Sequence, residues 1–196
     1  MGLQVSIIIP VYNQLPFLLK CIQSLTVTAN PAEVELILVD DCSTEFNLTE
    51  LMGAPFKVSR NQQNIGFSAT CNKGAMQATA SLLFILNSDT LARPNWLAPM
   101  VKAFDDDTVG IVGPKLTFPN LPEYGQGAGG IQSCGGLFDA GKGPYHRYLG
   151  CAPDYRLANK PEFVSWTTGA AIMTRRDLFL KLGGFDEGYK DRKSVV

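Results

Sequence analysis

The stretch Val5-Ser6-Ile7-Ile8-Ile9-Pro10-Val11 is an apolar run interrupted by one serine and one proline. A short run of this kind, rich in β-branched residues, is typical of a strand covered on both faces, as in a parallel sheet. Residues 15–29 follow with apolar side chains on one helical face, at Leu18, Ile22 and Leu25. A second apolar run occupies 34–39. We therefore predict a β-α-β unit with a right-handed crossover in the first forty residues.

The same alternation continues along the chain. It predicts strands at 56–59, 82–86 and 109–112, and helices at 67–78 and 95–104. Residues 118–155 are instead rich in Gly, Pro and Tyr, which predicts an irregular loop region with room for a hairpin and not an interdomain linker. A strand at 163–173 and a helix at 176–182 are expected after it. The predicted fold class is α/β, a three-layer α/β/α sandwich with a mostly parallel central sheet.

Composition narrows the function classes. The 196 residues suffice for one compact domain, and 45% hydrophobic against 18% charged residues is ordinary for a protein that folds in water. Seventeen basic and eighteen acidic side chains give a formal charge of -1 without a basic block, so we expect no nucleic-acid partner. The five cysteines include no C-x-x-C pair, which indicates neither a zinc site nor a disulfide framework and favours a cytoplasmic protein. The apolar runs are too short to cross a bilayer. We therefore expect any membrane association to be peripheral or to involve sequence outside this chain.

Polar clusters follow three of the predicted strands, at 10–13, 40–43 and 87–89. In open α/β sheets, ligands bind beyond the carboxyl ends of the strands. We therefore expect the three clusters to converge on one edge of the sheet.

Each cluster has a chemical interpretation and a structural one. Asp40 and Asp41 can accept hydrogen bonds from a base or a ribose, or can cap the helix after the loop. Asp89, with Asn87 beside it, can hold a divalent cation whose other ligands come from a diphosphate, or can belong to a turn. Residues 64–66, Asn-Ile-Gly, can present N–H groups to a phosphate at a helix start, or form a tight turn.

Taken together, these clusters resemble the family 2 glycosyltransferases, which have the GT-A fold. The matching segments are Val5-Ser6-Ile7-Ile8-Ile9-Pro10-Val11-Tyr12-Asn13, Glu35-Leu36-Ile37-Leu38-Val39-Asp40-Asp41-Cys42-Ser43, Asn64-Ile65-Gly66-Phe67 with Asn72, Leu86-Asn87-Ser88-Asp89, Trp166-Thr167-Thr168-Gly169-Ala170-Ala171 and Gly183-Gly184-Phe185-Asp186-Glu187. The resemblance covers nearly the whole chain.

The resemblance implies a nucleotide-sugar site made by Pro10, Tyr12, Asn13, Asp40, Asp41, Asn64, Gly66, Asn72, Asn87, Ser88 and Asp89. Within it, Pro10, Tyr12 and Asp41 are expected to border the base, with Asp40 beside them. Asn64, Gly66 and Asn72 are expected near the ribose or diphosphate, and Asp89 is the expected ligand of Mg²⁺ or Mn²⁺. The chain departs from the family's Asp-x-Asp motif at Asn87, whose amide oxygen can still bind a ribose hydroxyl or a metal-bound water.

The acceptor side is expected at Trp166 and Gly169. There an aromatic face can stack on a sugar, although a core tryptophan beside a strand glycine fits the sequence equally well. His146, the single histidine, lies in the Gly/Tyr region, where a surface loop position is favoured over a catalytic role.

The family transfers a sugar with inversion, and a carboxylate deprotonates the acceptor hydroxyl. The resemblance implies a UDP or dTDP sugar donor, a glycan or lipid-linked acceptor, and hexosyl or rhamnosyl transfer in bacterial surface polysaccharide assembly at the inner face of the membrane. The alternatives are a non-catalytic nucleotide-sugar-binding fragment and a nucleotidyltransferase-like enzyme. The absence of a Gly-rich loop after the first strand counts against the latter.

The family's catalytic base is expected beyond Lys190. Asp191 is a formal candidate but lacks the preceding Glu of the family pattern. A widely used sequencing-adapter sequence can encode residues 191–196, so we expect a non-native tail there, after a glycosyltransferase domain at 1–190 that is incomplete at its C-terminus.

Overall fold

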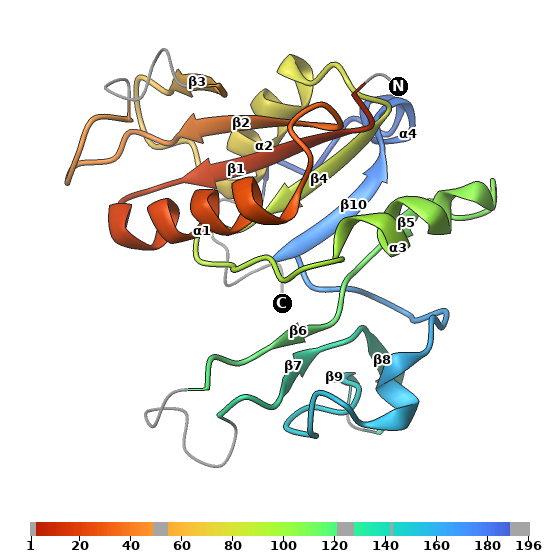
Figure 1. The fold of residues 1–196 in the computed structure, drawn as a ribbon. Coiled ribbons are helices and arrows are strands. Elements are labelled where there is room, and N and C mark those ends of the chain that lie inside the picture. Colours follow the sequence, from red (N-terminus) through yellow and green to blue (C-terminus); the bar gives the residue numbers. More distant parts are fainter. Residues whose placement is uncertain (1–2, 49–54, 121–127, 142, 189–196) are drawn as a thin grey trace. The chain divides into compact units, whose positions relative to one another are not determined.

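A six-stranded sheet organises the larger part of the computed structural model, which describes residues 3–48, 55–120, 128–141 and 143–188 (Figure 1). The strand order is β3-β2-β1-β4-β10-β5. The bounds are β1 Val5–Val11, β2 Val34–Asp40, β3 Lys57–Arg60, β4 Leu82–Leu86, β5 Ile111–Val112 and β10 Ala171–Arg175. Strands β1 to β4 pair in parallel, whereas β10 pairs with β4 in the antiparallel direction. The predicted mostly parallel sheet is confirmed.

The chain groups into two compact units, residues 1–111 together with 169–196, and residues 112–168. The first contains the large sheet. The second contains the whole region 118–155 that is predicted to be irregular. The assignment of 1–190 to one domain stays a prediction.

Strand β1 lies in the middle of the sheet, which explains its unbroken apolar sequence. It pairs with β2 from Val5 opposite Val34 to Val11 opposite Asp40, and with β4 on its other side. All its residues except Pro10 are buried. A strand with neighbours on both edges and helices on both faces has little contact with water, so apolar residues are favoured at almost every position.

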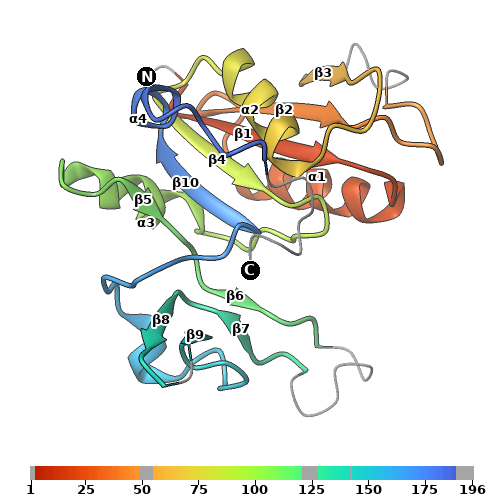
Figure 2. The same ribbon diagram turned by 180° about the vertical axis from the view of Figure 1, so that it is seen from behind.

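Helices cover both faces of this sheet, and the predicted three layers are confirmed. Helix α1 (Leu15–Thr28) and helix α2 (Phe67–Gln77) lie on opposite faces, as the two views in Figures 1 and 2 show. Helix α1 buries Leu18, Cys21, Ile22 and Leu25, the stripe expected from its sequence period. Two shorter helices, α3 (Leu97–Lys102) and α4 (Arg176–Lys181), complete the larger unit.

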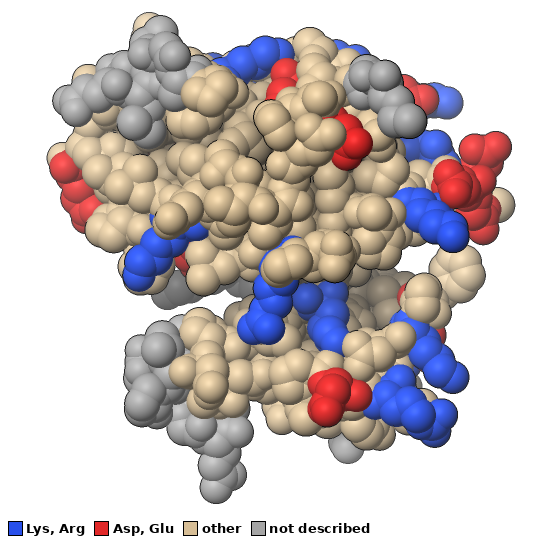
Figure 3. All heavy atoms as spheres, in the orientation of Figure 1, with Lys and Arg blue, Asp and Glu red and all other residues tan. Residues whose placement is uncertain are grey.

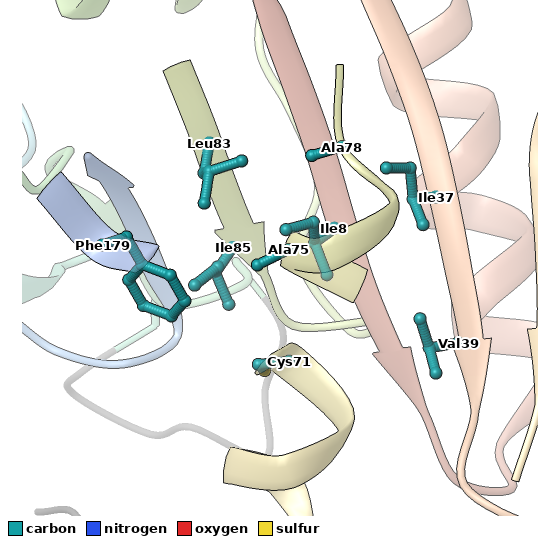
Figure 4. Packing of buried hydrophobic residues seen from close by; sticks show 9 residues of the cluster. All are labelled: Ile8, Ile37, Val39, Cys71, Ala75, Ala78, Leu83, Ile85 and Phe179. Atoms are coloured by element: carbon teal, nitrogen blue, oxygen red, sulfur yellow. The ribbon is translucent and has the colours of Figure 1, made fainter. Parts of the chain in front are cut away.

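The core between the sheet and α2 is apolar and tightly packed (Figure 4). It combines side chains of β1, β2, β4, α2 and α4 with Ala78, which directly follows α2; the residues are Ile8, Ile37, Val39, Cys71, Ala75, Ala78, Leu83, Ile85 and Phe179. Gly74 allows α2 to approach β1, because a Cβ atom there would lie 2.4 Å from Cγ2 of Ile8. The close approach fixes the helix against the strands whose carboxyl ends carry the polar clusters.

Glu35 joins the opposite, amino-terminal ends of the strands. Its Oε1 accepts the hydroxyls of Ser6 at 2.5 Å and Thr79 at 2.8 Å, and the Thr79 N–H at 2.7 Å, while its Oε2 pairs with Lys57 at 2.8 Å. Desolvation raises the pKa of Glu35, but the hydrogen bonds from Lys57, Ser6 and Thr79 outweigh it and lower the pKa to about 2. These bonds satisfy Ser6, the one polar residue of the apolar run in β1.

The second unit contains two small antiparallel sheets. Strand β6 (Leu116–Thr117) pairs with β7 (Ile131–Ser133), and β8 (Gly136–Asp139) forms a hairpin with β9 (Gly143–His146). A 3-10 helix, η4, spans Arg156–Asn159. This hairpin confirms the one for which the sequence of the Gly-rich region allowed.

Several predicted boundaries are wrong for identifiable reasons. The strand expected at 163–173 begins at Ala171, because Phe163 is 87% exposed and Trp166 instead bridges to Gly136 in the second unit. The helix expected at 95–104 begins at Leu97, after Asn95 in the left-handed region at φ 64°, and ends in a 3-10 turn, η2 (Ala103–Asp105). The strand expected at 109–112 is reduced to Ile111–Val112.

No helix among the described residues is long and apolar enough to cross a membrane. On the face drawn in Figure 3, Lys, Arg, Asp and Glu side chains of both signs lie among a larger uncharged surface.

Candidate functional site

The polar clusters that follow β1 and β2 meet directly at one edge of the sheet. The backbone N–H of Asp41 donates to the carbonyl of Val11 at 2.7 Å, and the N–H of Asn13 donates to the Ser43 hydroxyl at 2.8 Å. Strand β4 runs parallel to β1, so Asn87 follows it at the same edge. The three clusters therefore lie at the same edge of the sheet, as the sequence predicts.

Asn13 shapes the turn after β1. Its backbone is in the left-handed region, at φ 57°, where asparagine is tolerated better than most residues. Its side-chain oxygen accepts the N–H groups of Thr44 at 2.8 Å and Glu45 at 3.2 Å. The neighbouring Tyr12 is 43% exposed at this edge. Asn13 thus binds the loop after β2, next to the partly exposed Tyr12.

Asp40 is completely buried and serves the turn that follows it. One carboxylate oxygen accepts the N–H of Ser43 at 2.8 Å, and the other forms an ion pair with Arg60. Arg60 also donates to the carbonyl of Ser43 at 2.8 Å. These contacts stabilise the turn after β2 and are not those of a helix cap, and a contact of Asp40 with a ligand stays a prediction.

Asp41 binds the start of helix α2. Its Oδ1 accepts the side-chain amide of Asn61 at 2.9 Å and the N–H of Ile65 at 2.8 Å, while its Oδ2 accepts the N–H of Gly66 at 2.9 Å. The residue is 5% exposed. The N–H groups of Ile65 and Gly66, which the sequence offered to a phosphate, therefore point to this carboxylate.

Asn61 extends this network. It is 4% exposed, and its Nδ2 also donates to the hydroxyl of Thr70 at 3.1 Å. Its Oδ1 accepts Lys73 at 2.7 Å. The lysine fixes the orientation of the Asn61 amide, so that its NH₂ group faces Asp41.

Gly66 is needed where it stands, because its φ of 87° lies in the region that side chains rarely adopt. Asn64, two residues earlier, is exposed. Its predicted contact with the ribose or diphosphate stays a prediction.

Asn72 lies on α2 and is hydrogen-bonded to a distant segment of the same unit. Its Nδ2 donates to the carbonyl of Phe185 and to the carboxylate of Glu187, each at 2.9 Å, and its Oδ1 accepts the N–H of Phe185 at 2.8 Å. The structure thus places Asn72 against the Gly-Gly-Phe-Asp-Glu segment. Its predicted nucleotide contact is not tested.

The Asn87–Ser88–Asp89 turn follows β4. The N–H of Asn87 donates to the carbonyl of Ala170 at 2.9 Å, and Asn87 and Ser88 are half-buried. Asp89 is exposed and forms no hydrogen bond or ion pair within the part of the chain that the structure describes. A single open carboxylate beside a side-chain amide is compatible with a cation whose other ligands are phosphate oxygens and water. The described residues contain no group of three or more His, Cys, Asp or Glu side chains that could hold a metal on its own.

Asp89 also raises the pKa of a buried thiol, that of Cys21. Burial, and then the charge of Asp89, raise the pKa of Cys21 to about 12, against a smaller opposing effect of the Thr90 N–H. Cys21, on α1, is completely buried. All five cysteines of the chain are free thiols.

The residues expected on the acceptor side fall in different units. Gly169 belongs to the larger unit, and a Cβ added there would have no atom within 4 Å. Trp166 belongs to the second unit, where its ring covers Gly136 and contacts the ring of His146 edge-on at 4.6 Å. His146 also contacts the Ser133 hydroxyl at 3.2 Å. These contacts account for Trp166 and His146 as packed residues, and an acceptor role for Trp166 or Gly169 stays a prediction.

Lys190, Asp191 and the suspected tail 191–196 lie outside the described residues, so the expected position of the base stays a prediction. The sequence reasoning missed Arg60, Asn61 and Lys73. The available signal was the position of Arg60 and Asn61, which end and follow a short strand at the edge already marked by Asp40 and Asp41.

Comparison with known proteins agrees with this geometry. Residues 6–182 match the family described as Glycosyl transferase family 2, and the chain belongs to that family. It is 30% identical over 201 residues to the O-antigen biosynthesis protein RfbC of Myxococcus xanthus, a match that covers 95% of this chain and 15% of that protein. It is 27% identical over 194 residues to the pre-mycofactocin glycosyltransferase of Mycobacterium tuberculosis, covering 93% of this chain and 36% of that protein. The chain spans 15% to 36% of the length of its first curated relatives.

Solved structures show the fold. The crystal structure of GalNAc-T7 with UDP, GalNAc and Mn²⁺ superposes with a TM-score of 0.73 at 22% identity, over 96% of this chain and 38% of that one. The mannosyltransferase PcManGT from Pyrobaculum calidifontis, in complex with GDP-Man and Mn²⁺, gives a TM-score of 0.63 at 19% identity, over 98% of this chain and 50% of that one. The predicted GT-A fold is confirmed.

Proposed function

We propose that this chain binds a nucleoside-diphosphate sugar, of the UDP or dTDP type, at the sheet edge formed by the ends of β1, β2 and β4. The observation that carries the proposal is the direct joining of the Tyr12–Asn13 turn, the Asp40–Asp41 turn and the start of α2 by the hydrogen bonds of Asn13 and Asp41. Three loops that are fixed to one another form a site that needs little rearrangement on binding.

Tyr12 and Asp41 are the residues proposed to contact the base. Tyr12 offers a partly exposed ring on which a base can stack. A carboxylate has about four lone-pair positions, and Asp41 uses three of them for Asn61, Ile65 and Gly66. The remaining position can accept one N–H of a pyrimidine. Asp40, whose two oxygens bind Ser43 and Arg60, stabilises the turn after β2.

Asp89, with Asn87 and Ser88, is the proposed place for Mg²⁺ or Mn²⁺ and for the diphosphate. The open carboxylate of Asp89 would bind the cation directly, and the Asn87 amide would bind a hydroxyl or a coordinated water. A bound cation would offset negative charge on the departing diphosphate.

The reaction proposed for the whole protein is inverting transfer of a hexosyl or rhamnosyl group to the hydroxyl of a glycan or lipid-linked acceptor. The support is membership of the family and the similarity to RfbC, whose name refers to O-antigen biosynthesis. We place it in bacterial surface polysaccharide assembly, in the cytoplasm at the inner face of the membrane, with Trp166 and Gly169 on the acceptor side and the base beyond Lys190.

Equilibrium dialysis with radiolabelled UDP and dTDP sugars tests donor binding, with Tyr12→Ala and Tyr12→Phe as a matched pair. Base stacking on an aromatic ring contributes about 1–3 kcal/mol, so Tyr12→Ala is expected to weaken binding by about 5- to 150-fold. Tyr12→Phe keeps the ring and is expected to stay within about twofold of the wild type. Equal affinity in all three proteins contradicts the placement of the base on Tyr12.

The same labelled donors distinguish an enzyme from a binding module. Transfer to an acceptor, or slow release of the free sugar by hydrolysis, supports a glycosyltransferase. Binding without any turnover supports a non-catalytic nucleotide-sugar-binding protein. Absence of binding to every nucleotide sugar contradicts the proposed function.

A further inference from the structure

The side chain of Asn72 has its hydrogen-bonding groups occupied by the segment 184–187. Its amide NH₂ donates to Phe185 and Glu187, and its oxygen accepts the N–H of Phe185. An amide group has two hydrogens and one oxygen, and here each hydrogen and the oxygen has a partner. A nucleotide would have to displace the segment, or share the amide oxygen, to bind Asn72.

The segment is shaped to receive this side chain. Gly184 has φ 76°, and a Cβ atom there would lie 2.3 Å from Oδ1 of Asn72. The ring of Phe185 packs against Phe67, in the first turn of α2, with centroids 6.0 Å apart, and edge-on against Phe179 of α4 at 5.3 Å. Polar and aromatic contacts therefore dock the segment on α2 together.

The N-terminal part of the same helix is also attached to the sheet edge proposed to bind the donor, here called the donor edge. Asp41 binds the N–H groups of Ile65 and Gly66, which immediately precede α2. Asp41 and Asn72 therefore connect the end of β2 to the segment through the N-terminal half of α2. The exposed carboxylate of Glu187 is held at the end of this connection by Nδ2 of Asn72.

We propose that Asn72 is a positioning residue, which fixes the backbone of Phe185 and the carboxylate of Glu187 relative to the donor edge, and that it is not itself a nucleotide ligand. The inference rests on the proposed function for its effect on turnover. Its structural part can be tested without any activity.

Hydrogen exchange measured by mass spectrometry in the wild type, Asn72→Asp, Glu187→Gln and the double variant tests the structural part. Asn72→Asp replaces the NH₂ donor by an oxygen that faces the carbonyl of Phe185 and the carboxylate of Glu187, so we expect exchange of the amides at 184–187 to rise at least about tenfold. Exchange within α2 is expected to change less than about twofold. Glu187→Gln keeps an acceptor for Asn72 and is expected to have little effect.

The double variant supplies the rescue. A glutamine at 187 can donate to the aspartate at 72, which reverses the direction of the lost bond, so exchange is expected to fall at least about threefold from the level of Asn72→Asp. A residue that merely packs on α2 would show no such coupling. Asn72→Ala, which removes the bonds without adding a charge, repeats the measurement if Asn72→Asp does not fold.

UDP affinity with Mn²⁺, measured on the same proteins, separates positioning from ligation. We expect Asn72→Ala to bind UDP within about twofold of the wild type and, with a labelled donor, to lose kcat by at least about tenfold at nearly constant KM. Unchanged exchange at 184–187 together with a tenfold loss of UDP affinity would overturn the proposal and make Asn72 a ligand. If no protein binds UDP, the proposed function fails, while the exchange data still decide the role of Asn72.

Discussion

The carboxylate of Asp41 accepts the backbone N–H of Gly66 at 2.9 Å, and this bond joins the carboxyl end of β2 to the start of α2. Asp41 is 5% exposed, and its other oxygen is bound by Ile65 and Asn61. A buried carboxylate with three N–H donors stabilises the positive end of the helix and closes the loop that leads to it. The site proposed for the nucleotide base is thus also a structural junction of the fold.

Asp41→Asn is expected to destabilise the protein by about 1–3 kcal/mol. The new side-chain amide has only one oxygen that can accept a hydrogen bond. Its NH₂ group faces an N–H donor of the protein, and this buried donor loses its acceptor. Chemical unfolding monitored by circular dichroism measures the free energy of unfolding, and Asp186→Asn, at an exposed position, is the matched control. Equal stability of both variants would show that the three hydrogen bonds of Asp41 contribute nothing measurable.

Glu35 is expected to control the acid sensitivity of the fold. Its pKa is lowered from 4.5 to about 2 in the folded protein, where the hydrogen bonds from Lys57, Ser6 and Thr79 outweigh desolvation. A lowered folded pKa adds stability that is complete above about pH 4.5 and is lost as the pH falls toward 2. Glu35→Gln is therefore expected to be less stable than the wild type by about 1–3 kcal/mol at pH 7. Between pH 4.5 and 2 the variant is expected to lose less stability than the wild type, because glutamine does not titrate.

Urea unfolding at intervals from pH 7 to pH 2 measures this difference, with Glu33→Gln as the control. The side chain of Glu33 has no hydrogen bond or ion pair with the described residues, so its substitution should leave the acid profile unchanged. Superimposable acid profiles for Glu35→Gln and the wild type would contradict the role of Glu35.

Cys21 is expected to resist thiol reagents in the folded protein. Burial and the nearby charge of Asp89 raise its pKa from 9.0 to about 12, and the thiolate is the reactive form. The raised pKa also means that the contribution of the neutral Cys21 thiol to the free energy of unfolding is complete below pH 9 and is lost as the pH rises from 9 toward 12. Labelling with iodoacetamide at pH 8, located by peptide mass spectrometry, should modify half-exposed Cys42 well before Cys21. Equal labelling rates in the absence of denaturant would show that Cys21 is accessible.

The sequence predicts most of the larger unit because its central strands β1 and β4 are buried on both faces. The bounds of β1 and β4 agree with the prediction, since every residue of both strands except Pro10 is buried and each apolar run ends where its strand ends. The prediction fails at 163–170, where the apolar and aromatic residues resemble a strand but Phe163 is exposed and Trp166 is used in the second unit. Periodicity cannot tell which partner a tryptophan will pack against.

The site is predicted in position more than in detail. The ends of parallel strands must share an edge, so the meeting of Asn13 with the loop after β2 follows from the strand order. The hydrogen bonds of Asp41 to Asn61 and of Asn72 to Phe185 join residues 20 and 113 positions apart, and no local pattern specifies them. Asn72 is the clearest case, because a polar residue on a helix beside a nucleotide motif gives no indication that its partner lies near the other end of the chain.

Isothermal titration of UDP and dTDP into the wild type and Asp89→Ala, with and without Mn²⁺, tests the central claim most directly. Asp89 is exposed and without a hydrogen bond or ion pair among the described residues, so its removal should leave the fold intact. The proposed site predicts that Mn²⁺ tightens binding to the wild type at least about tenfold and has no such effect on Asp89→Ala. Equal affinity of the two proteins for the nucleotide in the presence of Mn²⁺ would contradict the assignment of this sheet edge as a metal-assisted nucleotide-sugar site.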